Sequence, residues 1–214
     1  GGLVVGNLGT VNSSSVKARF SACDYIGGLT GYNSSLIEAS SATGSIIETK
    51  VAGGLTDNNG GLILNSYADV AINTNAAAGG LVGYEDSGGV QNSYAMGSIS
   101  GGDGSTVGGL VGYAQNGGFE SSYSTGAVSG GANSSVGGFA GREDDAYFSD
   151  CYWDTTTSGT NDGVGGRNVT GLTGLTTQQL QSRLPKGFKK KVWTEKSALN
   201  DGFPYLLANP PPRK

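Results

Sequence analysis

Apolar residues recur along most of the chain at fixed distances, separated by small, polar or glycine residues. Six Gly-Gly pairs, spaced at nearly regular distances, are each followed directly by an apolar residue. These residues are Leu3, Leu29, Leu55, Leu81, Leu110 and Phe139. No 3.6-residue periodicity runs through these segments, and short apolar stretches interrupted by glycine favour strands over helices. The pattern therefore predicts short strands at repeated positions.

Two further apolar columns accompany the first. They are Val11, Ile37, Ile63, Val90, Phe119 and Phe148, and then Phe20, Ile46, Ile72, Ile99 and Val128. The Gly-Gly pairs begin at Gly1, Gly27, Gly53, Gly79, Gly108 and Gly137, so the repeat length is 26 or 29 residues. A fixed period of this size is typical of a solenoid, whose units bury their apolar faces against their neighbours. We expect an all-β fold over residues 1–150: a parallel β-helix with three strands per repeat and about six coils, right-handed as parallel crossovers generally are.

Two other arrangements fit the pattern less well. A disordered chain would not keep its apolar residues in register, and a β-propeller blade usually needs about 40 residues or more. All five prolines lie at Pro185 or later. Proline cannot donate a backbone hydrogen bond, so its exclusion from the repeats agrees with continuous strand pairing.

The rest of the chain differs in character. We expect residues 151–208 to form a C-terminal cap with a short helix and strands, and residues 209–214 to form a proline-rich tail or linker. Thr176 or Thr177 is the candidate N-cap of a helix from Gln178 to Arg183, which would end before Pro185. We expect this part to cover the last coil, whose open edge would otherwise invite aggregation. The residues expected to do so are Phe188, Val192, Trp193, Phe203, Tyr205 and Leu206.

Composition and charge exclude several functions. The net charge is −4, and no Lys or Arg occurs between Lys50 and Arg142. Such a surface would repel phosphate backbones, which argues against nucleic-acid binding. No apolar stretch approaches the roughly 20 residues that span a bilayer, and no signal peptide is visible. Because the chain opens inside a repeat, we expect a mature product or a fragment of a longer protein.

The absence of histidine from the sequence removes Ser-His-Asp and Cys-His catalysis and the usual zinc sites. Cys23 and Cys151 would lie about five coils, or roughly 24 Å, apart in the β-helix. A disulfide needs Cα atoms within about 7 Å, so two buried or partly buried thiols are expected instead.

Two repeats carry a recognisable motif: GGLVGYEDSGGVQNSYAMG from Gly79 and GGLVGYAQNGGFESSYSTG from Gly108. These segments resemble the GLUG motif of bacterial surface and secreted proteins. The copy at Gly53 departs from it with GGLTD but keeps Asn65-Ser66-Tyr67. CYWDTTTSG, GLTTQQLQ and DGFPYL, between Cys151 and Leu206, resemble the segment that closes such arrays in filamentous-haemagglutinin-like adhesins.

The resemblance implies a protein that is secreted or held on the bacterial cell surface. It favours a non-enzymatic adhesin segment, a stalk that displays binding loops to a host-surface or matrix glycan or protein. Two alternatives stay open: a filament subunit that stacks end to end with copies of itself, and a polysaccharide-processing β-helix. Related repeats also accompany some secreted peptidases, so the motif alone does not establish adhesion.

Candidate ligand-binding residues lie after each GGLVG, where variable loops are expected. They are Tyr84, Glu85, Asp86, Tyr113, Gln115 and Asn116. Another column, Tyr67, Tyr94, Tyr123 and Tyr152, is interpreted as a packed tyrosine stack with its hydroxyls at the rim, with sugar contact as the alternative.

No cofactor is expected, although weak calcium binding is possible at two acidic places. One combines Glu143, Asp144 and Asp145, in the loop after Gly141, with Asp150 and Asp154, and the other is Asn161-Asp162-Gly163. Neither matches the spacing of an EF-hand loop.

Overall fold

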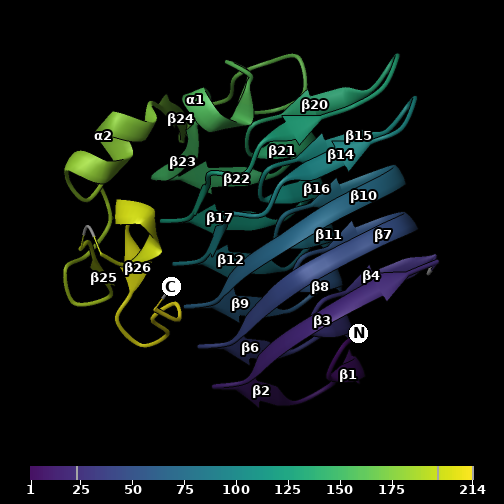
Figure 1. Ribbon diagram of the computed structural model, residues 1–214, viewed down its shortest axis with the longest axis horizontal. Coiled ribbons are helices and arrows are strands. Elements are labelled where there is room, and N and C mark those ends of the chain that lie inside the picture. Colours follow the sequence, from purple (N-terminus) through teal and green to yellow (C-terminus); the bar gives the residue numbers. More distant parts are fainter. Residues whose placement is uncertain (23, 197, 214) are drawn as a thin grey trace.

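The computed structural model describes residues 1–22, 24–196 and 198–213, and it shows a parallel β-solenoid of six coils (Figure 1). The first of its three faces is a six-stranded sheet. Its strands are β1 (Val4–Asn7), β5 (Thr30–Asn33), β8 (Thr56–Asn59), β11 (Val82–Asp86), β16 (Val111–Gln115) and β21 (Ala140–Asp144). The second face has the same number of strands. They are β2 (Thr10–Asn12), β6 (Leu36–Glu38), β9 (Leu62–Leu64), β12 (Gly89–Gln91), β17 (Gly118–Glu120) and β22 (Tyr147–Ser149).

The third face is a 12-stranded sheet. It contains β3 (Ser15–Ser21), β4 (Tyr25–Gly27), β7 (Ser41–Gly53), β10 (Tyr67–Gly79), β13 (Tyr94–Ala95), β14 (Ile99–Gly101), β15 (Thr106–Gly108), β18 (Tyr123–Ser124), β19 (Val128–Ser129), β20 (Ser135–Gly137), β23 (Cys151–Asp154) and β24 (Leu172–Leu175). In the first repeat this face contains β3 and β4, and in the second and third repeats it is one continuous strand, β7 or β10. In the next coil, residues 102–105 of the longer repeat form a turn that separates β14 from β15.

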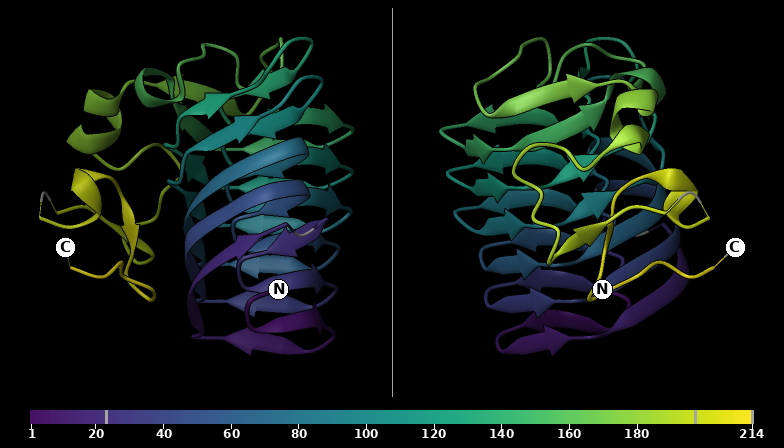
Figure 2. Two further views of the ribbon diagram at one scale, coloured as in Figure 1. Left: turned by 45° about the vertical axis from the view of Figure 1, so that its right-hand side comes forward. Right: turned by 90° about the vertical axis from the view of Figure 1, so that its left-hand side faces the viewer.

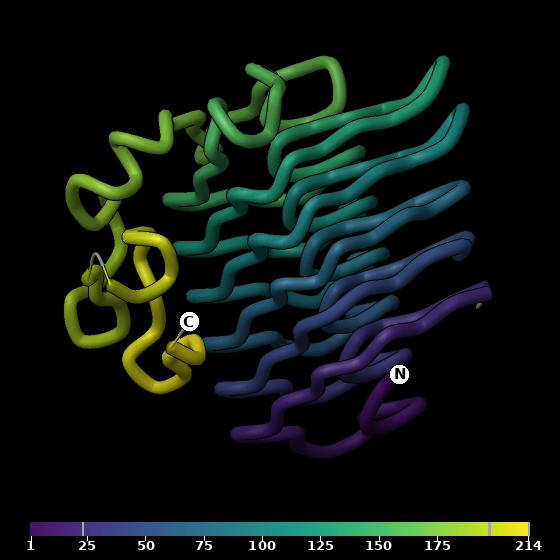
Figure 3. Tube along the Cα trace, viewed as in Figure 1, coloured from purple at the N-terminus to yellow at the C-terminus, as the bar shows by residue number. Residues whose placement is uncertain are grey.

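The strand registers confirm the apolar columns. Ile37 pairs with Ile63, and Ile72 pairs with Ile99, each one repeat further along the chain. The columns fill the solenoid with side chains such as Leu55, Leu81 and Phe119, all fully buried. Figure 3 shows the coils as successive rungs. Apolar residues at equivalent positions of successive repeats therefore pack on one another through the core, as the repeat pattern predicts.

Residues 151–175 cover the last coil. They contain β23, β24 and the short helix α1 (Thr155–Ser158), which Asp154 caps by accepting hydrogen bonds from the backbone NH groups of Thr156 and Thr157. The Phe139 NH donates to the Gly163 carbonyl across the end of the solenoid. The expected helix is present as α2 (Thr177–Ser182), and Thr176 and Gln179 form a capping box at its start.

The aromatic C-terminal segment takes a different place from the one expected. It turns back along the flank of the solenoid (Figure 2), where β25 (Trp193–Thr194) pairs antiparallel with β26 (Tyr205–Leu206) after a 3-10 turn at Asn200–Gly202. Phe188 and Trp193 stack at 4.4 Å and pack against the column of four tyrosines. The prediction that these residues cover the last coil is wrong, because Phe188, Trp193, Phe203 and Leu206 pack with the tyrosine column instead.

The rings of the tyrosine column stack as expected, but their hydroxyls do not lie at the rim of the solenoid. Its rings stack at 5.0 Å between Tyr67 and Tyr94 and at 5.1 Å between Tyr94 and Tyr123. Tyr94 and Tyr123 are fully buried, and the Tyr123 hydroxyl donates to the Pro204 carbonyl. The expectation that the hydroxyls lie at the rim is therefore wrong, and the buried rings of Tyr94 and Tyr123 are closed to sugar contact.

The single thiol that the structure describes, Cys151, is free and buried. Cys23 lies outside the described residues, so the expectation for that thiol is not addressed.

We expect Trp193→Ala to lower the free energy of unfolding by about 3–5 kcal/mol, because it removes a fully buried ring from the tyrosine ladder. Chemical denaturation followed by circular dichroism measures this change. Tyr147→Ala is the matched control, since the Tyr147 ring is 68% exposed and its loss should change little. Equal effects of the two variants would show that the C-terminal segment contributes no stability through this packing.

Candidate functional site

A groove of about 280 Å³ runs along the solenoid beside the Gly-Gly corners. One wall is the register column Tyr25, Val51, Ala77 and Thr106, which leads into each corner. The other wall is the column Asn58, Tyr84, Tyr113 and Arg142, which follows each corner. Asp57 completes the lining. We call this site the tyrosine groove.

The aromatic side of the groove is held in place by contacts between coils. The rings of Tyr84 and Tyr113 meet edge to face at 5.0 Å. The Tyr84 hydroxyl donates to Gln115 and the Tyr113 hydroxyl to Asp144, each in the following coil. Because the hydroxyls are already paired, the rings offer their faces and edges to a ligand.

A cation already sits on one of these rings. The Arg142 guanidinium lies 5.1 Å from the centre of the Tyr113 ring, a distance at which a cation is attracted to the face of an aromatic ring. Arg142 also donates to Asp144 at 2.9 Å, and the Tyr113 hydroxyl and Arg142 together lower the pKa of the Asp144 carboxyl.

Asp57 is the carboxylate of the groove. Its side chain is only 9% exposed, and its Oδ1 has no hydrogen-bond partner. Burial raises the pKa of Asp57 to about 6, against a smaller opposing effect of the Gly1 amino group. An acceptor left unpaired in this way costs stability, which marks Asp57 as a residue with a role other than packing.

The candidate residues from the sequence are only partly brought together. Five of the six do not lie in loops: Tyr84, Glu85 and Asp86 belong to β11, and Tyr113 and Gln115 to β16. Asn116 follows β16 in a bend. Tyr84 and Tyr113 line the groove, and Gln115 supports the first of them. Asp86 and Asn116 are exposed outside the groove lining.

Glu85 is a correction to the expectation of a displayed binding residue. It is fully buried and continues a ladder of asparagine side chains inside the solenoid. The Asn7 amide donates to Asn33 at 2.7 Å, Asn33 to Asn59 at 2.6 Å, and Asn59 to the Glu85 carboxyl at 2.9 Å. Burial raises the pKa of Glu85 to about 8, in spite of the hydrogen bond from Asn59. Its side chain points inward because the strand register places it above Asn59.

Three of the acidic residues named for calcium, Glu143, Asp144 and Asp154, already have other partners. Glu143 and Asp144 lie in β21 and not in a loop, and they pair with Arg167 and Arg142. Asp154 caps α1 and accepts a hydrogen bond from the Thr177 hydroxyl at 2.6 Å. Among the described residues, no three Cys, Asp or Glu side chains are grouped as metal ligands would be. Weak calcium binding stays a prediction.

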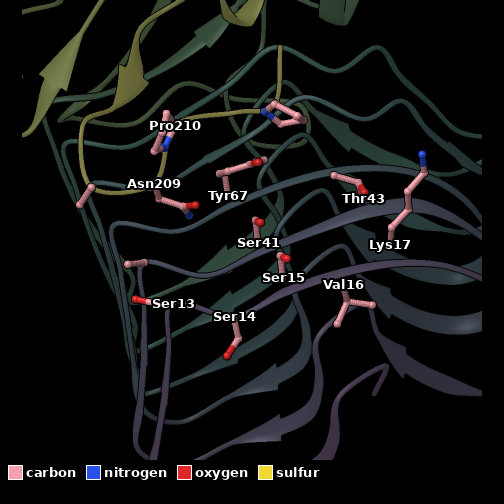
Figure 4. Close-up of a pocket in the computed structure, with 13 residues that line it drawn as sticks. Ser13, Ser14, Ser15, Val16, Lys17, Ser41, Thr43, Tyr67, Asn209 and Pro210 are labelled. Atoms are coloured by element: carbon pink, nitrogen blue, oxygen red, sulfur yellow. The ribbon is translucent and has the colours of Figure 1, made fainter. Parts of the chain in front are cut away.

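A second groove, of about 470 Å³, lies at the foot of the tyrosine ladder (Figure 4). Ser15 and Ser41 occupy the ladder position in the first two coils, where Tyr67 stands in the third. The missing rings leave space, which residues 208–212 of the tail partly close, and the Asn209 amide donates to the Ser40 carbonyl at 3.0 Å. Its polar atoms are mainly serine and threonine hydroxyls.

Sequence reasoning missed Asp57, Tyr25 and Arg142. For Asp57 a signal exists, since GGLTD breaks the pattern in which glycine is the third residue after the Gly-Gly pair. Tyr25 and Arg142 carry no such signal. They join the groove because the corner brings two distant columns to face each other.

Three comparisons relate the chain to known proteins. The model of the GLUG motif matches residues 103–129. No curated protein matches the chain. Among solved structures, the chain is similar to a provisionally assigned immunoglobulin A1 protease from Bacteroides ovatus, with a TM-score of 0.62 and 18% identity over 96% of this chain and 75% of that chain. At this identity the likeness shows a shared fold. None of the three connects the chain to filamentous-haemagglutinin-like adhesins, so that resemblance stays a prediction.

In the described part of the chain, no helix has both the length and the apolar character required to cross a bilayer.

We expect the stability of the protein to fall as pH rises from 5 to 8, and Glu85→Gln to remove part of that fall. The folded protein holds Glu85 protonated up to a pKa of about 8, whereas the ordinary value is 4.5. The stabilisation is complete below pH 4.5 and is lost as the pH rises through 8. Glutamine keeps an acceptor for Asn59 without a charge, so Glu85→Gln should be more stable than the parent at pH 8 by on the order of a few kcal/mol.

Thermal melts at several pH values test this expectation, with Asp86→Asn as the control because Asp86 is an exposed carboxylate in the same strand. If Glu85→Gln followed the same pH curve as the parent protein, the carboxyl would not be held protonated.

Proposed function

We propose that the chain is a non-enzymatic binding segment of a secreted or cell-surface bacterial adhesin. In this proposal the β-solenoid is a stalk, and the tyrosine groove is the surface that contacts a host-surface or matrix component. The observation that carries the proposal is the groove itself: two tyrosine rings fixed by contacts between coils, beside a buried and unpaired carboxylate. The GLUG match and the solenoid fold agree with such a role.

The acidic groups support binding over glycoside cleavage. Glycosidases generally need two carboxyl groups that face each other across a cleft. Among the described lining residues of the tyrosine groove, Asp57 is the one carboxylate. Glu85 is buried in the asparagine ladder, and Glu143 and Asp144 are paired with arginines.

Among the described residues Cys151 is the one thiol, and it does not suit the role of a peptidase nucleophile. The name of the Bacteroides ovatus protein refers to a protease, but the likeness to it concerns the fold. Burial raises the pKa of the Cys151 thiol to about 12, and the sequence contains no histidine to activate it. A reactive thiol needs a lowered pKa and access to the substrate, so Cys151 is better explained as a core residue.

One observation favours the filament as a second candidate. The strands β1, β2 and β3 pair on one side only within the described chain. Val5 and Leu8 beside them are 83% and 82% exposed. Open strand edges of this kind accept further strands, which another copy, or additional coils of a longer protein, would supply.

We expect the purified chain to bind host cells or extracellular matrix, and the double substitution Tyr84→Ala with Tyr113→Ala to reduce that binding about tenfold, because aromatic anchors carry much of the energy of an interface. Binding of fluorescently labelled protein to cell monolayers and matrix-coated surfaces provides the measurement. Tyr147→Ala serves as the control, because it removes an exposed tyrosine that does not line the groove. Binding that survives the double substitution would place the adhesive surface elsewhere.

The filament candidate has its own test. Light scattering over a concentration series, with electron microscopy of the same samples, should show a mass that rises with concentration if coil ends stack. Val5→Lys with Leu8→Lys should then restore a monomer, because like charges on an open edge oppose pairing. A monomer at every concentration removes this candidate for the isolated chain.

A further inference from the structure

The strand position that Asp57 occupies carries glycine in four other coils. The positions equivalent to Asp57 in neighbouring coils are Gly31, Gly83, Gly112 and Gly141. The corner is crowded, since a Cβ atom at Gly83 would come within 2.7 Å of the Asp57 carbonyl oxygen and 3.0 Å of the Ala52 backbone. The carboxylate of Asp57 therefore departs from the glycine of the repeat, at a corner where little space is left for a side chain.

The unpaired polar atoms of the groove are acceptors. Asp57 Oδ1 and the adjacent Asn58 Oδ1 are both buried without a hydrogen-bond partner. With a pKa raised by burial to about 6, the Asp57 carboxyl is ionised at pH 7. A group that brings several NH donors and a positive charge would satisfy both acceptors.

The walls suit such a group and its apolar stem. Val51 and Ala77 line one side, and the rings of Tyr25, Tyr84 and Tyr113 line the groove around them. A cation gains energy on the face of a tyrosine ring, and Arg142 already shows this contact with Tyr113. The methylene groups of a long side chain pack well against such surfaces while the charged head reaches a polar partner.

We propose that the tyrosine groove binds the primary ammonium group of a lysine side chain on a partner protein, with Asp57 as its counter-ion and the tyrosine rings around its stem. This inference rests on the proposed binding function and names the chemistry of the partner. The ammonium donates to Asp57 Oδ1 and Asn58 Oδ1, while the methylene chain lies between Val51 and Tyr84.

Other ligands match the groove less closely. Arg142 in the lining is already paired with Asp144, whereas Asp57 Oδ1 has no partner and would repel an anion. A neutral sugar presents hydroxyls that need donors as well as acceptors, whereas Asp57 and Asn58 leave acceptors unpaired. The amine therefore fits the groove better than either.

The test is a titration of the whole chain with Nα-acetyl-lysine N-methylamide, followed by NMR and calorimetry. The matched probe is Nα-acetyl-norleucine N-methylamide, which keeps the apolar stem without the ammonium. We expect the lysine probe to bind and the norleucine probe to bind at least about tenfold more weakly, because hydrogen bonds to charged groups contribute the most. Equal binding of the two probes, or no binding of the lysine probe, would overturn the proposal, and binding of maltose instead would identify a sugar site.

Two substitutions at Asp57 make the test specific. Asp57→Asn keeps the shape and removes the charge, and it should weaken binding of the lysine probe about tenfold or more. Asp57→Gly restores the residue found in four neighbouring coils, so it should fold with unchanged or greater stability and lose binding. Tyr84→Leu should weaken binding about two- to fivefold through loss of the ring face. Unchanged binding by folded Asp57→Gly would contradict the assigned counter-ion.

The inference and the proposed function can fail separately. If the parent chain and Asp57→Gly adhere equally to cells, the lysine proposal fails and the adhesin proposal stands. If the lysine probe binds through Asp57 but no host cell or matrix surface retains the chain, the amine site stands and adhesion fails. Acetylation of the lysines on a matrix surface should abolish retention if both are correct.

Discussion

The backbone hydrogen bonds between successive coils are the constraint on which the rest of this structure depends. Each strand pairs in parallel with the same strand of the next repeat, so a residue stacks on its equivalent about 4.8 Å away. Leu55 therefore lies over Leu29, and Tyr94 over Tyr67. Every residue type that occurs in one repeat becomes part of a column, and the column determines whether it can be buried.

The columns also explain where chemistry arises, because each candidate feature is a break in one of them. Asparagines pair along the interior until Glu85 replaces the amide with a carboxyl and Ala114 ends the ladder. Glycine occupies the corner position in four other coils, and Asp57 places a buried carboxylate there. Tyrosines stack on the flank until Ser41 and Ser15 leave the hydroxyl-lined groove beside the tail. A regular solenoid is chemically uniform, so a substitution within a column creates a site with its own polarity.

Two different segments of the chain cover the end and the flank of the solenoid. Residues 151–175 extend the coil pattern across the end, where Phe139 and Ala140 bond to Gly163. The tyrosine column projects from the flank, and its three stacked rings, Tyr67, Tyr94 and Tyr123, need a cover of their own. Phe188 and Trp193 provide it. The tyrosine groove, on the corner side, has no such cover, and the rings of Tyr84 and Tyr113 line it.

The sequence by itself determined the coils, their number, their strand registers and a small helix capped by Thr176 or Thr177, of which the structure selects Thr176. These features depend on local patterns: a fixed period, apolar columns and a capping residue. The side on which the C-terminal segment packs, the burial of Glu85 and the composition of the tyrosine groove were decided by the tertiary structure. Whether Glu85 faces inward depends on the register above Asn59, and the groove depends on the corner that brings Tyr25 and Asp57 to face Tyr84 and Tyr113. These contacts join residues of different columns, which are not neighbours in the sequence, so the repeat pattern does not predict them.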